Sequence, residues 1–263
     1  MQSFGDVSRT ACPLCESVNF HNVWKIPFTR IAGGVVNRVK LLQVPLLSST
    51  MVYSYSQCKD CGTIFLDPYS GTYWDNRNID HHPKKARERQ EWSNYQQRVQ
   101  YLLNVPILQY NTVVDIATGG CQCLTVMKEM GIPWKRMIAT DIQQPSVDYA
   151  NELGYEGYQH DICKDPLICE NEANYVIFAE AFEHVQSPLI AMQNIAKMLA
   201  PDGYVYFTAT ATEGNLPVRP GEDIMVTEKA LIQMLLKCGL TMIMRKFSSE
   251  RWLVVAQKVP MNQ

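Results

Sequence analysis

The sequence has no excess of one charge, no long apolar run and no even number of cysteines. Its 24 Lys and Arg residues nearly offset its 26 Asp and Glu residues, which leaves a formal net charge of -2. Without a broad basic field, nucleic acid is not an expected partner. No apolar run is long enough to span a membrane, and residues 1–9 lack the basic and then apolar pattern of a secretory signal. We therefore expect a cytoplasmic protein that does not bind membranes.

Nine cysteines cannot all pair, which argues against a secreted disulfide framework. Four of them form two C-x-x-C pairs, Cys12 with Cys15 and Cys58 with Cys61. Each pair lets one tight turn offer two thiolates, and two such turns complete a tetrahedral S4 site of the structural zinc type. We therefore predict these four cysteines as ligands of Zn2+. Unconnected thiols or a thioredoxin-like redox pair are the alternatives.

Composition divides the chain into three segments. Residues 1–70 hold both cysteine pairs, and the 42 residues between the pairs exceed the usual ribbon spacing of roughly 15 to 20. We predict a zinc-ribbon domain with a β-rich insertion at residues 31–57. Residues 71–104 are predicted to form a helical junction beside the substrate cleft, with a locally basic helix that begins near Lys84. Its charges are typical of a solvated helix face, and contact with a phosphate is the alternative.

Residues 105–263 alternate between short apolar strands and amphipathic helices. Strands are predicted at Thr112–Ile116, Met137–Thr140, Tyr158–His160, Tyr175–Phe178, Tyr204–Thr210, Leu240–Phe247 and Trp252–Gln257. Helices are predicted at Leu124–Met130, at Ser146–Leu153, from Ser187 onward and at Thr227–Cys238. This alternation predicts an α/β fold with a mostly parallel sheet and helices on both of its sides.

Acidic residues follow the predicted strands where ligands of such sheets bind, beyond the carboxyl ends. Asp115 closes the first strand and is followed by Gly119, where the missing side chain lets a ligand approach the backbone. Asp141 closes the second strand, 22 positions after Gly119, about where an acid accepts hydrogen bonds from ribose hydroxyls. Asp161 and Glu180 follow the next two strands. This acidic rim favours a cationic nucleoside over a pyrophosphate.

Four segments carry a family resemblance, namely Val113–Cys121, Ala139–Ile142, Asp161–Ile162 and Glu180–Val185. Together they resemble class I S-adenosylmethionine (SAM)-dependent methyltransferases, and Cys58–Pro68 looks like the zinc-ribbon front end of some members in bacterial sugar and natural-product pathways. The resemblance implies a Rossmann-like, seven-stranded methyltransferase sheet whose last two strands form a reversed hairpin. It also implies SAM as the cofactor, with these binding residues: Asp115, Ala117, Gly119, Asp141, Ile142, Asp161, Ile162 and Glu180.

The sequence departs from the family pattern D-x-G-x-G-x-G at two positions. Ala117 and Cys121 stand where the first and third glycines are usual. Ala117 adds one methyl group, which is tolerated if its backbone angles are ordinary. Cys121 either narrows the approach to the cofactor, acts as a reactive thiol or serves as a small buried residue. The departures keep open a degenerate, non-catalytic interaction module with the same fold.

Methyl transfer is an in-line displacement, for which a protein supplies alignment and, where needed, a base for the acceptor proton. His184 is the candidate general base because it follows the fourth strand beside Glu183. We therefore predict His184 and Glu183 as the catalytic residues, and packing at the helix entrance is the alternative role of His184. The spacing Glu180-x-x-Glu183-His184 also permits a divalent ion, as in small-RNA methyltransferases.

The expected acceptor is a small polar metabolite, such as a sugar nucleotide or a biosynthetic intermediate. This expectation follows from the resemblance and from the absence of a broad basic field. The enzyme alternative is an RNA methyltransferase that docks through the zinc ribbon and the basic helix.

Overall fold

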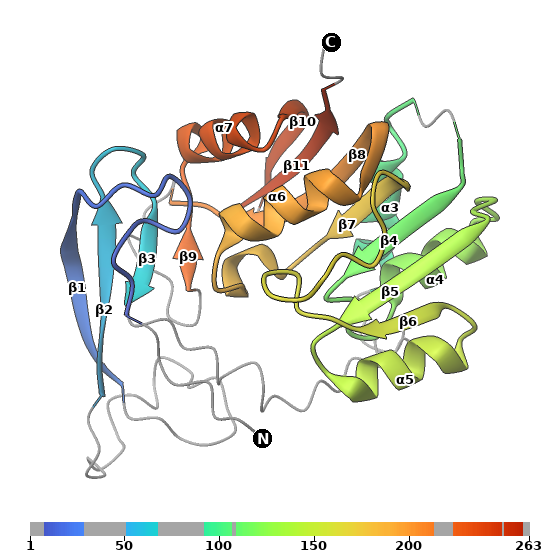
Figure 1. The fold of residues 1–263 in the computed structure, drawn as a ribbon, viewed down its shortest axis with the longest axis horizontal. Helices are drawn as coiled ribbons and strands as arrows, with labels where there is room; N and C mark the ends of the chain where they lie inside the picture. Colours follow the sequence, from blue (N-terminus) through green and yellow to red (C-terminus); the bar gives the residue numbers. More distant parts are fainter. Residues whose placement is uncertain are drawn as a thin grey trace.

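The computed structural model describes residues 8–28, 51–67, 92–106, 109–212, 223–248 and 250–259. These residues form two sheets, a small antiparallel sheet at the N-terminal ribbon and a large, mostly parallel sheet (Figure 1). The small sheet carries the cysteine turns and the large sheet carries the acidic strand ends. The two predicted sites therefore belong to different sheets.

The large sheet has seven strands in the order β10-β11-β8-β7-β4-β5-β6. Strands β4 to β8 run parallel to one another, whereas β11 is antiparallel to both β8 and β10. The bounds are β4 Thr112–Ile116, β5 Arg136–Asp141, β6 Glu156–Gln159, β7 Ala173–Phe178, β8 Leu199–Thr210, β10 Leu240–Ser248 and β11 Arg251–Lys258. The predicted α/β class, the seven strands and the reversed terminal hairpin are confirmed.

The helices begin where side chains cap their free amides. Ser187 Oγ accepts from the Ile190 amide at 3.3 Å, and Thr227 Oγ1 accepts from the Ala230 amide at 3.1 Å. Each cap satisfies an amide that has no partner inside its helix. Gly239, with φ of 68°, follows the last helix in the left-handed conformation that favours glycine. The bounds are α3 Trp92–Leu102, α4 Gln122–Glu129, α5 Gln144–Glu152, η1 Phe182–His184, α6 Pro188–Met198 and α7 Glu228–Lys237.

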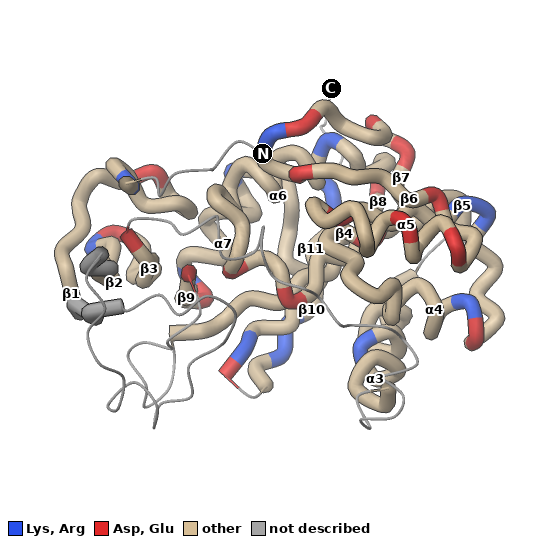
Figure 2. The backbone as a smooth tube through the Cα atoms, turned by 90° about the horizontal axis from the view of Figure 1, so that it is seen from below, with Lys and Arg blue, Asp and Glu red and all other residues tan. Residues whose placement is uncertain are grey.

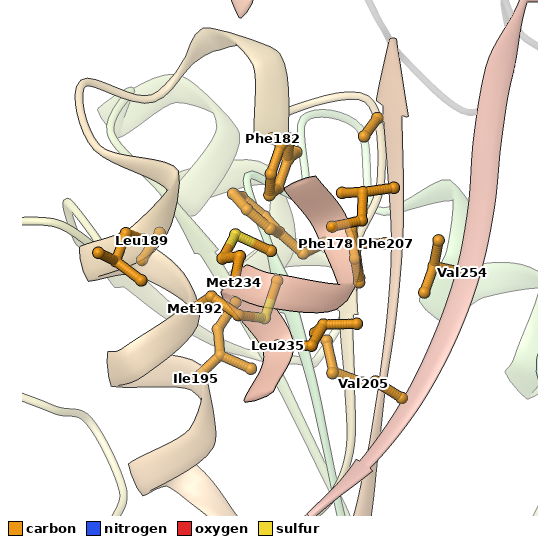
Figure 3. Packing of buried hydrophobic residues seen from close by; sticks show 14 of the residues in the cluster. Phe178, Phe182, Leu189, Met192, Ile195, Val205, Phe207, Met234, Leu235 and Val254 are labelled. Carbon is orange, nitrogen blue, oxygen red and sulfur yellow. The ribbon is translucent and has the colours of Figure 1, made fainter. Parts of the chain in front are cut away.

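Two apolar clusters cover the two faces of the large sheet, because alternate residues of a strand point to opposite sides. In β8, Val205 and Phe207 join the cluster beneath α6 and α7, whereas Tyr204 and Tyr206 join the cluster beneath α3 and α4. Figure 3 shows the first cluster, in which side chains of α6 and α7 meet those of β7, β8 and β11. Burial on both faces explains why these strands read as continuous apolar runs in the sequence.

The small sheet has the order β1-β2-β3-β9 and is antiparallel throughout. Its bounds are β1 Phe20–Phe28, β2 Met51–Cys58, β3 Ile64–Asp67 and β9 Ile224–Met225. Strand β9 comes from the segment between β8 and α7, yet it lies beside β3 (Figure 1). Phe65 and Ile224 also belong to the same apolar cluster as α6 and α7. The C-terminal half of the chain therefore completes the ribbon sheet and shares its core.

The predicted elements of the large sheet are all present, and β4 has the predicted bounds. Strands β1, β3 and β9 were not predicted. Strand β9 has two residues and a distant partner, so it leaves no periodic signal. Residues 31–50 of the predicted insertion, and the basic residues from Lys84 to Arg89, lie outside the described residues.

Positive and negative positions are mixed over both sheets (Figure 2). Arg136, for example, pairs with Glu156 at 2.8 Å and with Glu172 at 3.1 Å. Within the described ranges, no helix has the length and apolar character needed to cross a bilayer. The mixed charges do not favour a polyanionic partner over a small one.

Gly62 lies where the ribbon meets α7, with φ of 80°, and a Cβ built there would lie 2.9 Å from Thr227 Cγ2. Gly131 has φ of 71° and no atom within 4 Å of such a Cβ. We expect Gly62→Ala to lower the free energy of unfolding by about 2 to 4 kcal/mol, because strain and overpacking add. Gly131→Ala should lower it by about 1 kcal/mol through strain alone. Urea unfolding measures both losses.

The double variant Gly62→Ala with Thr227→Ser removes the methyl group that the new Cβ would meet. It should recover about 1 kcal/mol relative to Gly62→Ala alone. Equal losses for the two glycine variants would contradict a tight contact between the ribbon and α7.

Candidate active site and metal centre

The two cysteine turns have the same backbone geometry. In the first, the Cys12 amide donates to the carbonyl five residues later at 2.8 Å, and the Glu16 amide donates to the Cys12 carbonyl at 2.9 Å. In the second, the Cys58 amide and the Gly62 amide make the equivalent bonds at 2.9 Å each. Glu16 and Gly62 both have positive φ, at 65° and 80°. Each C-x-x-C therefore forms the same turn.

The four predicted ligands bring their sulfur atoms together, with all four Sγ atoms within 4.8 Å of one another. Cys12 Sγ lies 3.7 Å from Cys61 Sγ, and Cys15 Sγ lies 3.5 Å from Cys58 Sγ. A zinc ion with bonds of about 2.3 Å holds tetrahedral sulfurs about 3.8 Å apart, so the spacing fits zinc. The hydrogen bond between Cys12 and Cys61 lowers the pKa of Cys61 and raises that of Cys12, so these two sulfurs share one proton until a metal displaces it.

The loop after β4 contains three residues with positive φ, Ala117 at 55°, Gly119 at 54° and Cys121 at 57°. Ala117 therefore lacks the ordinary backbone angles on which its predicted tolerance depends. The left-handed conformation costs a residue with a Cβ about 1 to 2 kcal/mol. Cys121 is fully buried, and burial raises the pKa of its thiol to about 12, so it packs rather than reacts. Gly119 remains open, because a Cβ built there would meet no atom within 4 Å.

Asp141 ties the end of β5 to the loop after β4. Its Oδ2 accepts from the Gly119 amide and its Oδ1 from the Gln143 amide, both at 2.9 Å. Each oxygen keeps a second lone pair, with which it can accept a ribose hydroxyl. Asp115, near the end of β4, accepts from Thr118 Oγ1 at 2.9 Å. Burial raises the pKa of both carboxyl groups, that of Asp115 to about 7.

The next predicted cofactor residues follow β5 and β6. Asp161 comes two residues after β6 and accepts from Lys164 Nζ at 2.7 Å. Ile162 is buried, whereas Ile142 is 40% exposed directly after Asp141. An exposed isoleucine beside a buried carboxylate offers apolar surface to a flat ring while the acid binds polar groups.

Glu180 follows β7 and has φ of 55°. Its carboxylate pairs with Arg98 of α3 at 2.7 Å and with Arg251 of β11. Arg251 also lies 2.7 Å from Oε1 of Glu183, which is fully buried and accepts from the Thr210 hydroxyl at 3.2 Å. Two guanidinium groups thus balance two carboxylates, which lowers the cost of burying Glu183.

His184 closes η1, and its Nδ1 lies 3.9 Å from Oδ2 of Asp223. The two side chains are 14% and 10% exposed. Glu180 and Glu183 thus share Arg251 as a charged partner, whereas His184 faces Asp223. Within the described ranges, the four cysteines are the only group of three or more residues arranged to hold a metal, so the alternative of a catalytic ion at Glu180, Glu183 and His184 has no support in this geometry.

Three charged residues of the site were not assigned there from sequence. Arg98 was seen only as part of a basic helix, and Arg251 and Asp223 were not singled out. Arg98 and Arg251 lie 82 and 71 positions from Glu180. The one sequence signal was the charge of Arg251 at the start of an apolar strand. That charge indicates that Arg251 needs an acidic partner, but it does not show which one.

A family model described as a methyltransferase domain matches residues 61–248, more than half of the chain. The comparison with curated proteins found no match. Among solved structures, a SAM-dependent methyltransferase from Aquifex aeolicus has a TM-score of 0.54 and 20% identity, over 68% of this chain and 100% of that chain.

Two further structures are similar. A complex between the Haloferax volcanii methyltransferase activator and a putative methyltransferase has a TM-score of 0.54 and 15% identity, over 69% of this chain and 98% of that chain. The Burkholderia thailandensis 1,6-didemethyltoxoflavin-N1-methyltransferase, bound to 1,6-didemethyltoxoflavin and S-adenosylhomocysteine, has a TM-score of 0.51 and 15% identity, over 65% and 82%. At these identities the similarity shows the fold alone.

Asp115 gives a testable pH dependence. Because burial raises its pKa from 3.8 to about 7, the folded state holds the proton more tightly than the unfolded chain. Its contribution to stability is complete below about pH 4 and is lost as pH rises through about 7. Asp115→Asn should therefore gain about 2 to 4 kcal/mol relative to wild type between pH 4.5 and pH 8.

Urea unfolding of wild type and Asp115→Asn at the two pH values measures this gain. Asp148→Asn, at an exposed position of α5, is the matched control. A difference between Asp115→Asn and wild type that is the same at both pH values would contradict the buried, protonated carboxyl group.

The cysteine cluster predicts about one zinc ion per chain in the purified protein. Cys58→Ser should release the metal and destabilise the ribbon by several kcal/mol, because metal binding and folding are coupled. Cys238→Ser, at the end of α7 and outside the cluster, should retain the metal. Elemental analysis of the three proteins measures zinc content, and unchanged zinc in Cys58→Ser would reject the S4 site.

Proposed function

The chain belongs to the methyltransferase domain family and is a SAM-dependent methyltransferase, and from this premise we propose that it methylates a small polar metabolite, such as a sugar nucleotide or a biosynthetic intermediate. The observation that carries the cofactor-binding half of the proposal is the hydrogen bond from the Gly119 amide to Asp141. It holds the open glycine turn against an acid at the end of the neighbouring strand. This arrangement suits a nucleoside whose charged end lies over the turn.

We propose that Asp141 binds the ribose hydroxyls through its free lone pairs, with Ile142 against the base. Asp161 and Ile162 are proposed to contact the adenine. Asp115 fixes the turn through Thr118, and its carboxyl group favours a cation when ionised. The acidic strand ends fit a positively charged sulfonium better than a pyrophosphate.

The cofactor supplies an electrophilic methyl group when bound, so the protein has to orient the acceptor and remove its proton. We propose His184 as the base that accepts this proton. It is the last residue of η1, which begins four residues after the end of β7, and its side chain is 14% exposed. An ordinary imidazole titrates near neutral pH, which suits a general base.

Glu183 is proposed to act through position rather than by touching the acceptor. It is fully buried and bound to Arg251 and Thr210, which fixes the backbone next to His184. Glu180 and Arg98 lie at the same end of the sheet and form a balanced pair. We propose that this pair lies beside the charged methionine end of the cofactor, where both of its charges find partners.

Zinc is proposed to have a structural role, because four thiolates leave no open position for substrate. The proposed domains are a ribbon at residues 1–70, a junction at residues 71–104 and the methyltransferase domain at residues 105–263. A reducing cytoplasm, the proposed location, keeps the ligand thiols available to zinc.

Isothermal titration calorimetry with SAM and S-adenosylhomocysteine tests the binding half of the proposal. Wild type should bind both compounds, and Asp141→Asn should bind about 10- to 100-fold more weakly, because a charge-assisted hydrogen bond is lost. Glu172→Gln, at the opposite end of the sheet, is the control and should bind as wild type does. A wild-type protein that binds neither compound would support the non-catalytic module instead.

His184→Gln tests the catalytic half. It should bind SAM as wild type does, yet transfer methyl groups about 100-fold more slowly or worse, because the base is lost. The readout is transfer of labelled methyl groups from SAM to metabolite extracts, with RNA as a parallel acceptor. Labelling of RNA alone would favour the RNA alternative, and full turnover by His184→Gln would reject the base.

A further inference from the structure

The segment that holds Asp223 is bonded to both sheets. Strand β9 pairs with β3 of the ribbon, and the Leu66 amide donates to the Asp223 carbonyl at 2.8 Å. A few residues later, the Val226 amide donates to the carbonyl of Thr210 in β8 at 2.8 Å. The position of Asp223 therefore depends on the ribbon strand as well as on the large sheet.

Arg9 joins the same ribbon strand to the segment that follows η1. Its backbone amide donates to Asp67 Oδ1 at 2.9 Å, and its Nε donates to the Leu66 carbonyl at 3.2 Å. Its Nη1 donates to the carbonyl of Gln186 at 2.7 Å, two residues after His184. The end of β3 is thus bonded on one side to the Asp223 segment and on the other to the His184 segment.

The two segments meet at the imidazole. Asp223 Oδ2 faces Nδ1 of His184 at 3.9 Å, and both side chains are largely buried. A carboxylate facing one ring nitrogen favours the proton on that nitrogen and leaves the other nitrogen free to accept one. At 3.9 Å the two atoms lie beyond hydrogen-bond distance, so Asp223 acts on the imidazole through its charge and not through the short hydrogen bond of a catalytic triad.

The metal site is connected to the same segment. Thr227 Oγ1 donates to the carbonyl of the ligand Cys61 at 2.7 Å, while it caps α7 by accepting from the Ala230 amide. The turn that contains Cys58 and Cys61 also leads directly into β3. Loss of the metal would therefore release the end of the strand that Arg9 and Asp223 share.

We infer that the metal-bearing ribbon holds Asp223 against His184, which makes Asp223 a positioning residue for the base and Arg9 the link between the ribbon and η1. The inference rests on the proposed role of His184 as base. The ribbon then belongs to the catalytic apparatus and is not a separate docking module. Among the residues that the structure describes, the strand ends at Asp115 and Asp141 bond to the neighbouring turns and not to the ribbon, so SAM binding should survive when this link is broken.

Nuclear magnetic resonance of 15N-labelled histidine tests the inference without an acceptor. The His184 signals are assigned by their loss in His184→Gln, and the tautomer ratio is measured where the imidazole is neutral. In wild type the Nδ1-protonated form should predominate. Asp223→Ala and the shape-conserving Asp223→Asn should both change that ratio several-fold, and Arg9→Gln or removal of zinc from wild type should change it in the same direction.

Lys229→Gln is the matched control, because Lys229 also joins the two halves, through the Asp60 carbonyl at 2.9 Å, but lies off this path. Its His184 ratio should equal that of wild type. An unchanged ratio in both Asp223 variants, or after zinc removal, would overturn the inference. Calorimetry with SAM on the same samples separates the two claims, since failure to bind SAM with the coupling intact would reject only the proposed function.

Discussion

The pairing of β3 with β9 is the interaction on which the arrangement of this protein depends. It is short, yet it joins a ribbon near the N-terminus to the segment between β8 and α7. Around it, Phe65 and Ile224 are buried in the same cluster as the helices that cover the large sheet. Burying apolar area across the junction makes separation of the halves costly, at roughly 25 cal/mol per Å2 of apolar surface exposed. The ribbon is therefore part of the fold rather than an appended module.

Charge is distributed unevenly along the edge of the large sheet at which β4, β5 and β7 end. Glu180 and Glu183 are balanced by Arg98 and Arg251, whereas Asp141 accepts hydrogen bonds from the backbone amides of Gly119 and Gln143. Amides stabilise a carboxylate without cancelling its charge, so the edge near β5 stays acidic. A nucleoside that carries a sulfonium can use both environments. Its ribose hydroxyls can donate to Asp141, and its zwitterionic methionine end can pair with the cluster of glutamates and arginines.

Much of the fold was accessible from sequence because its strands are buried on both faces and its helices carry caps. The apolar run at Thr112–Ile116 and the Ser187 cap are local signals, and local patterns predict local structure. The cysteine spacing likewise predicted that Cys12, Cys15, Cys58 and Cys61 come together. Strand β9 and the partners of Arg251 and Asp223 depend on contacts between distant residues, which leave no such pattern. The positive φ of Ala117 was missed for a related reason, because the turn imposes it against the preference of the residue.

The central claim is that the pairing of β3 with β9 couples the structure of the ribbon to that of η1, which carries the proposed base. Hydrogen-deuterium exchange with and without a zinc chelator tests it most directly, because exchange reports local opening along the whole chain. The account predicts that zinc removal exposes amides in residues 223–227 and 182–190 as well as in the ribbon, while residues 112–116 and 136–141 stay protected. Loss of protection confined to residues 8–67 would contradict it.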